Sequence, residues 1–141
     1  MSINKQLIRE AVRKRVIAAS GIDPITQFQE ENKDFDSNGL DFWIAEYCIS
    51  GAEIAITPHR SRISSFIMQY DLYAPLNSGT ERIDSAMMAI CEEFDMADPT
   101  KSGLDIPGYA INLTSITPEV DAGKNKQRQM LVLTFDVIKG G

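Results

Sequence analysis

Apolar residues recur every three or four positions in two stretches of the chain, which is the spacing of one buried helix face. The first stretch begins near Ser2, a candidate N-cap, and continues to Ala19, where Gly21 is placed to end the helix. The second follows Ser78 and Glu81, which match a capping box in which each side chain caps the other residue's backbone amide. It has the clearest period in the chain, at Ile83, Ala86, Met87, Ile90, Cys91 and Phe94.

Alternation of apolar and polar residues predicts strands elsewhere. Residues 40–49 are apolar on both faces, so we expect this strand to be covered on both sides or to meet a partner. Residues 60–74 would span about 50 Å at ~3.3 Å per residue, which exceeds a small core, so one end is expected to project. The other predicted strands are a short one at 53–57 and two longer ones at 109–114 and 130–138.

This order predicts an α+β fold with two helices packed on one face of a mostly antiparallel sheet of four to five strands. Residues 1–141 are expected to form a single domain, because this length suits one core. Residues 22–39 have no sustained period and include the turn signal at 36–39. Loops of this length are commonly functional or mobile.

Composition and charge narrow the classes of function. The net charge of -6 disfavours wrapping of nucleic acid over a broad surface. Cys48 and Cys91 lie in apolar periodic stretches, which predicts two buried thiols in a reducing compartment. The first residues lack the apolar core of a signal peptide, and no apolar run approaches the ~20 residues of a membrane span. We therefore expect a protein made in the cytoplasm and not bound to a membrane.

Motifs for catalysis are scarce. His59, the single histidine, follows Pro58 at a turn and is expected to be exposed. The chain has no spacing typical of zinc ligands and no glycine-rich phosphate loop after a strand. We therefore expect no catalytic residues, no cofactor and no metal ligands, and the protein is not expected to be an enzyme.

Carboxylates are the plentiful reactive groups. Magnesium or calcium would accept oxygen ligands from the first loop, although a solvated acidic loop is the simpler interpretation. Glu46 and Asp71 on strands leave open a metal-dependent nuclease, although no lysine lies at close strand spacing. The acidic residues of the loop are Glu30, Glu31, Asp34 and Asp36.

Basic residues gather in two places. On the first helix they predict either a solvated face or a docking surface for an acidic partner or subunit. Near the last hairpin they alternate, which indicates protection of a strand edge, or contact with a neighbouring subunit or with DNA. The helical set is Lys5, Arg9, Arg13, Lys14 and Arg15, and the hairpin set is Lys124, Lys126 and Arg128.

Several segments, taken in order, resemble one known family. They are the opening helix INKQLIREAVRKRV, Glu31-Asn32 with Phe35, the strand end QYDLYAP at 69–75, the Gly79-Thr80 turn into a helix, and LTFDV at 133–137. Together they resemble the tail terminator proteins of tailed phages, a family that includes the phage lambda terminator and a phage-related domain of unknown function. The resemblance covers nearly the whole chain.

The resemblance implies a structural protein that forms a ring, usually a hexamer, at the head-proximal end of a tail tube. The ring ends polymerisation of the tube and then receives the head–tail connector or head-closure protein. Its partners would be copies of itself, the tube protein and the connector, with DNA passing through the lumen and the finished ring in the virion tail. By analogy, arms fall at 51–65 and 119–129. The candidate interface residues are Arg9, Arg13, Arg60, Arg62, Lys124, Lys126 and Arg128.

Three alternatives remain open from the sequence. The chain could be another neck or tail tube component, which the sequence separates poorly from a terminator. It could be a metal-dependent nuclease that uses Asp34, Asp36, Glu46 or Asp71. It could also be a small binding module without a role in phage assembly.

Overall fold

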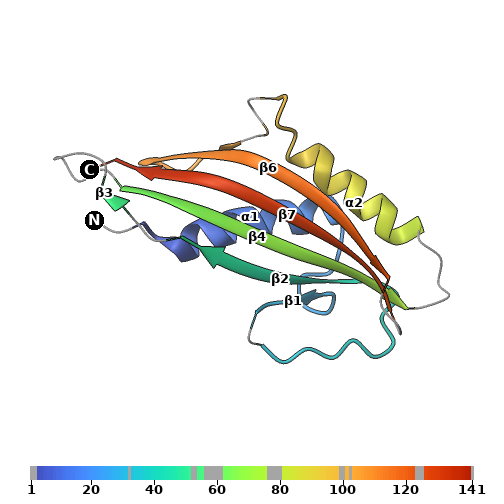
Figure 1. Ribbon diagram of the computed structural model, residues 1–141. Coiled ribbons are helices and arrows are strands. Elements are labelled where there is room, and N and C mark those ends of the chain that lie inside the picture. The colour runs from blue at the N-terminus through green and yellow to red at the C-terminus, as the bar shows by residue number, and fades with distance from the viewer. Residues whose placement is uncertain are drawn as a thin grey trace.

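A computed structural model describes residues 3–31, 33–51, 54–55, 62–75, 81–98, 101, 103–122 and 126–140, with backbone alone at 54–55, 119–122 and 126–127. Within these residues, two helices and seven strands follow one another along the chain (Figure 1). In order, they are α1 (Lys5–Ser20), β1 (Phe28–Gln29), β2 (Trp43–Ser50), β3 (Ile54–Ala55), β4 (Arg62–Pro75), α2 (Glu81–Glu93), β5 (Gly103–Leu104), β6 (Tyr109–Ala122) and β7 (Lys126–Lys139).

The strands form one sheet in the order β1-β2-β4-β7-β6-β5, with β3 paired to β4 outside this path. Strand β1 runs parallel to β2, and the other pairs are antiparallel. The predicted α+β class with two helices is confirmed. The sheet has seven strands instead of four to five, because β1, β3 and β5 each contain two residues. Two residues are too few to display an alternation, so only the segment at β3 was predicted as a strand.

Local capping sets the ends of the first helix. Asn4 is its N-cap, and the side-chain oxygen of Asn4 accepts a hydrogen bond from the amide of Leu7 at 3.1 Å. The expected start near Ser2 is therefore wrong, because the helix begins after this cap; Ser2 itself lies outside the described residues. Gly21 ends the helix as predicted, with φ at 70°, a left-handed conformation that glycine adopts without steric cost. The predicted capping box of the second helix involves Ser78, which also lies outside the described residues.

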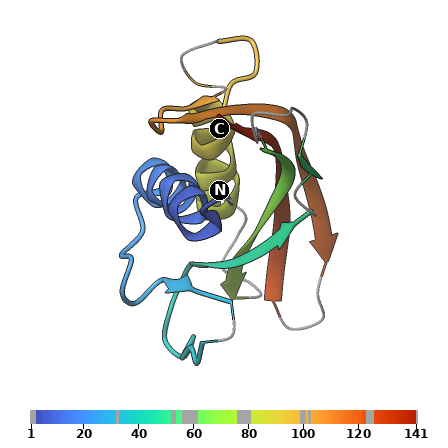
Figure 2. The same cartoon turned by 90° about the vertical axis from the view of Figure 1, so that its left-hand side faces the viewer.

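The core lies between the helices and one face of the sheet, which curves around them (Figure 2). Helix α1 contributes Ile8, Val12 and Val16, all fully buried, and each such side chain stabilises the fold by roughly 1.5–3 kcal/mol through burial. The matching rows on the two central strands are Phe66, Met68, Tyr70 and Leu72 on β4, and Leu131, Leu133, Phe135 and Val137 on β7. These rows are the alternating positions that the sequence pattern predicted.

The three longest strands end level with one another. Strand β4 pairs with β7 along its full length, from Arg62 opposite Lys139 to Pro75 opposite Lys126, and β6 pairs with β7 from Tyr109 onward. Inner-face side chains of β4 are buried from Ser64 to Ala74. The expectation that one end of this strand projects is therefore wrong for the described residues, because partner strands of equal length and two successive helices cover it.

Candidate assembly surfaces

Arg13 on α1 points into the domain and pairs with a buried carboxylate. Its Nη2 lies 2.6 Å from Oε1 of Glu46, its Nε donates to both oxygens of that carboxylate, and Nη1 lies 3.3 Å from Glu30. Glu46 is 2% exposed and also accepts a hydrogen bond from the Tyr70 hydroxyl at 2.9 Å. The hydrogen bond to Glu46 raises the pKa of Arg13, and burial raises the pKa of Tyr70 well above its usual value. Arg13 therefore stabilises the domain, and most of its charge is not available for docking.

Arg15 also serves the fold, at the end of the second helix. Its guanidinium lies 4.3 Å from the centre of the Phe94 ring and donates to the carbonyl of Glu93 at 2.7 Å. It also donates to the carbonyls of Lys101 and Gly103, each at 2.9 Å. A cation at the last carbonyl of α2 is favourable against the helix dipole. Acidic residues near the C-terminus of a helix are unfavourable against its dipole, and the positive charge of Arg15 compensates those at this end of α2.

The remaining basic residues of α1 face outward or lie at its side. Lys5 and Lys14 are exposed, and Arg9 is half-buried with its Nε unpaired. Arg9 lies beside Cys48, where burial raises the thiol pKa more than the arginine lowers it. Cys48 and Cys91 are both half-buried free thiols, so the prediction of unpaired cysteines holds, whereas that of full burial does not.

Of the other predicted interface residues, Arg62 and Arg128 are the ones whose side chains the structure describes, and both lie on the sheet. Arg62 begins β4 with its Nε buried and unpaired, and Arg128 on β7 lies 3.7 Å from Asp71. For Lys126 only the backbone in β7 is described. His59, Arg60 and Lys124 lie outside the described residues. Residues 119–122 and 126–129, predicted as part of an arm, are regular ladder positions of β6 and β7.

The predicted nuclease pair does not come together. Glu46 is opposite Tyr70 in the β2–β4 ladder, and Asp71 is the next residue on β4, so the two carboxylates point to opposite faces of the sheet. In the acidic loop, Glu30 pairs with Arg13 and Lys33, whereas Glu31 accepts from the amide of Cys48 at 3.2 Å. Within the described part of the chain, no three acidic, histidine or cysteine side chains gather as a metal site would require.

The sheet face opposite the helices carries a mixed row of side chains, and no described helix covers it (Figures 1 and 2). Trp43 stacks on Tyr73 with ring centres 5.4 Å apart and is 4% exposed. Asp71 is 2% exposed and accepts a hydrogen bond from Gln69 at 2.9 Å. Other apolar side chains of this outer face, by strand register, are Ala45, Ile49, Ile63, Ile67, Met130, Val132 and Ile138.

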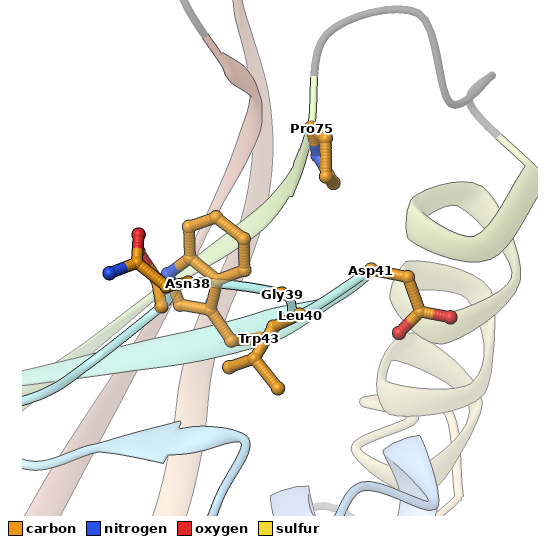
Figure 3. A pocket seen from close by; sticks show the side chains of 7 residues that line it. Asn38, Gly39, Leu40, Asp41, Trp43 and Pro75 are labelled. Atoms are coloured by element: carbon orange, nitrogen blue, oxygen red, sulfur yellow. The ribbon is translucent and has the colours of Figure 1, made fainter.

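An open cavity of about 460 Å³ lies where the first loop meets the ends of β2 and β4. Residues 37–41, Trp43 and Pro75 line it, and Figure 3 shows the Trp43 indole beside Asn38, with the Asp41 carboxylate directed away from the indole. Asp41 is the one ionisable side chain in this lining, so no acid–base pair is present there. This cavity suits contact with a partner better than chemistry.

A second groove, of about 390 Å³, is lined by α1 residues between Glu10 and Ala18 and by Pro24, shortly after the helix ends. Ile17, Ala18 and Pro24 give it an apolar floor. Ile25, next to Pro24, is 86% exposed, which extends the apolar surface. Charged residues at the rim are Glu10, Arg13 and Lys14. Of the basic residues predicted on this helix, Arg13 and Lys14 line the groove, and Lys14 is the exposed one of the two. The sequence pattern did not indicate this apolar groove.

Comparisons with known proteins bear on the fold. No protein-family model and no curated protein matches the sequence. Among solved structures, 27 chains match. One of them, whose name states no activity, is 22% identical to this chain with a TM-score of 0.63, and the match covers 96% of each chain. A likeness at this identity shows a shared fold over nearly the full length. No helix in the described ranges is long and apolar enough to cross a membrane.

Proposed function

We propose that this chain is a ring-forming capping protein of a phage tail, which ends polymerisation of the tail tube and presents a surface for head joining. The sequence resemblance to tail terminators supports this assignment. The observation that carries it is the long sheet whose outer face no described helix covers. At ~3.3 Å per residue, its 14-residue strands are about 46 Å long, which offers a large face for subunit, tube or connector contacts.

The two layers of the domain support a ring because they present different surfaces. A ring needs heterologous contacts, in which one surface of a subunit meets another surface of its neighbour. The outer sheet face is rich in isoleucine, at positions 49, 63, 67 and 138, and includes the buried carboxylate of Asp71. The exposed sides of the two helices are instead dominated by charged residues, namely Lys5, Glu10, Lys14, Glu81, Asp84 and Glu92. One subunit therefore has two chemically distinct faces available for head-to-tail association.

Pairing through the open edge of β6 is less suited to assembly. Among described residues, β6 pairs with β5 at Ile111 and Asn112 and has no second partner beyond them. A bulge between Leu113 and Ser115 and the proline at 118 interrupt this edge. Bulges and prolines are common devices that prevent pairing with further strands. We therefore assign assembly to the faces of the domain.

Deletion of the gene from the phage genome that carries it tests the proposal, with tail lengths measured in the lysate by negative-stain electron microscopy. Overlong, unjoined tubes beside DNA-filled heads are the expected result. Tails of normal length that fail to join heads would move the protein to the head-side neck. Normal virions would remove the assembly role, and expression of the intact gene in trans is the control.

A further inference from the structure

The two helices of one subunit carry opposite charge on their exposed sides. After the arginines that serve the fold are set aside, α1 keeps the exposed Lys5 and Lys14 and the half-buried Arg9 against Glu10. On α2, Arg82 is also used internally, because it lies 4.2 Å from the centre of the Phe42 ring and donates to the carbonyl of Ser20 at 3.0 Å. The exposed charges left on α2 are Glu81, Asp84 and Glu92. In a chain of net charge -6, the basic side of α1 is an exception.

The apolar features of the two helices are complementary as well. Met88 on α2 is 64% exposed, and Asp84 and Glu92 lie one helical turn before and after it. The groove on α1 has an apolar floor at Ile17, Ala18 and Pro24, with Lys14 at its rim. Methionine is unbranched and flexible, so its side chain adapts to an irregular apolar groove. The volume of about 390 Å³ leaves room for one such side chain.

We propose that α2 of one subunit packs against α1 of the next, with Met88 in the groove and Glu92 beside Lys14. This inference rests on the proposed ring and names the contact that would close it. A second copy is the occupant that the charges favour, because both halves of the match lie on one chain. Because the halves lie on different helices, a head-to-tail contact uses each half once per subunit and repeats around a ring, whereas a two-fold pairing of α1 with α2 in both directions would close at a dimer. A symmetric pairing of α1 with α1 would bring like charges together.

The charges near the contact set the choice of test. Asp84 already accepts a hydrogen bond from Gln129 at 2.7 Å, so Glu92 is the freer carboxylate beside Met88. Glu10 at the groove rim accepts from Gln6 at 2.9 Å, which leaves Lys14 as the rim cation without an internal ion pair among the described contacts. Both Lys14 and Glu92 are exposed, so reversal of either charge leaves the core intact.

Sedimentation velocity of the purified full chain across protein and salt concentration measures the association. We expect Lys14→Glu and Glu92→Lys each to weaken self-association about tenfold or more, and the double reversal to restore it. Asp105→Lys introduces the same charge change as Glu92→Lys at an exposed loop residue and is expected to associate like the wild type. A wild-type chain that stays monomeric, or one whose association ignores both reversals, overturns the proposal.

A cysteine trap tests the geometry independently of charge. In a background with Cys48→Ala and Cys91→Ala, which removes the two half-buried native thiols, the Ala18→Cys/Met88→Cys double variant is expected to form a ladder of disulfide-linked oligomers on oxidation. Each subunit then has one thiol on each side of the contact. Each single variant is the control and is expected to yield no ladder. Absence of a ladder in the folded double variant would contradict this contact. The tail-length experiment does not depend on which surfaces join the subunits, so the proposed function and this inference fail separately.

Discussion

Two buried carboxylates, Glu46 and Asp71, lie one residue apart in the β2–β4 ladder but on opposite faces of the sheet. Glu46 faces the helices and receives three hydrogen bonds from Arg13 and one from Tyr70. Asp71 faces the other way, where Gln69 donates to it and Arg128 is 3.7 Å distant. The inner carboxylate thus has a cation from the helix layer in direct hydrogen-bond contact. The outer carboxylate is held within the sheet, by Gln69 and the Tyr73 hydroxyl of its own strand and by the more distant Arg128 of β7.

The difference distinguishes a charge that holds the domain together from one at a surface open to partners. Burial of a carboxylate is costly unless charges and hydrogen bonds compensate it. Glu46 has this compensation within the folded chain. On the outer face, Arg128 remains partly exposed at 31%, so the pair there keeps contact with solvent. Three substitutions test this contrast, in order of decreasing expected effect.

Arg13→Met is expected to cost about 3–5 kcal/mol of unfolding free energy, because it leaves Glu46 buried without its cation. The measurement is urea unfolding at neutral pH, followed by fluorescence of Trp43, the single tryptophan. The double variant Arg13→Met/Glu46→Gln is the control, since glutamine is neutral and keeps an acceptor for the Tyr70 hydroxyl. It is expected to recover at least half of the loss; a double variant as unstable as the single one would contradict the ion-pair argument.

Tyr70→Phe is expected to cost about 1.5–3 kcal/mol at neutral pH through loss of its hydrogen bond to a charged acceptor. It should also change the response to alkali. Burial raises the folded-state pKa of Tyr70 above about 10, so the folded protein holds a proton that the unfolded chain releases. The stability that the protonated Tyr70 hydroxyl contributes to the folded state is complete below about pH 10 and is lost as the pH rises above it.

Urea titrations between about pH 9 and 11 measure this dependence. The wild type should lose more stability across this range than Tyr70→Phe, which has no phenolic proton. The comparison subtracts the titration of lysines and the other tyrosines, which both chains share. Equal slopes in the two chains would mean that Tyr70 does not hold its proton in the folded state.

Asp71→Asn is expected to cost about 1 kcal/mol, because the pair with a partly exposed arginine is weak and asparagine still accepts from Gln69. The same urea titration measures it, and a higher salt concentration should narrow the difference from wild type by screening. A loss as large as that of Arg13→Met would show that the outer face depends on this charge as strongly as the inner face depends on Glu46.

Much of the fold was predictable because its signals are local. The alternation of Phe66, Met68, Tyr70 and Leu72 predicted an inner row of β4, and the helical spacing of Ile83, Ala86 and Ile90 predicted the buried side of α2. Gly21 was identified as the end of α1 because glycine tolerates a left-handed backbone. The short strands β1 and β5 gave no such signal, since two residues carry no period.

The candidate surfaces were less predictable, because helical spacing alone does not say which basic residue of a row reaches a partner. Arg13 and Lys14 are neighbours on one helix, yet Arg13 meets Glu46, 33 positions along the chain, whereas Lys14 remains exposed. An acidic residue inside an otherwise apolar strand, as at Glu46, was the available signal that a buried cation would face it. The apolar groove depends on Pro24 folding back beside α1, which no local pattern encodes.

The sequence by itself determined the two helices and the longer strands with their buried sides, because the periods of helices and strands follow from backbone geometry between near neighbours. Only the tertiary structure decided which charges are used internally. Arg15 caps α2 from 78 positions away, Glu46 and Asp71 separate onto two faces, and Lys14 and Met88 stay at the surface. Those outcomes depend on which segments meet in space, and the energy of a buried charge depends on the partner it finds there.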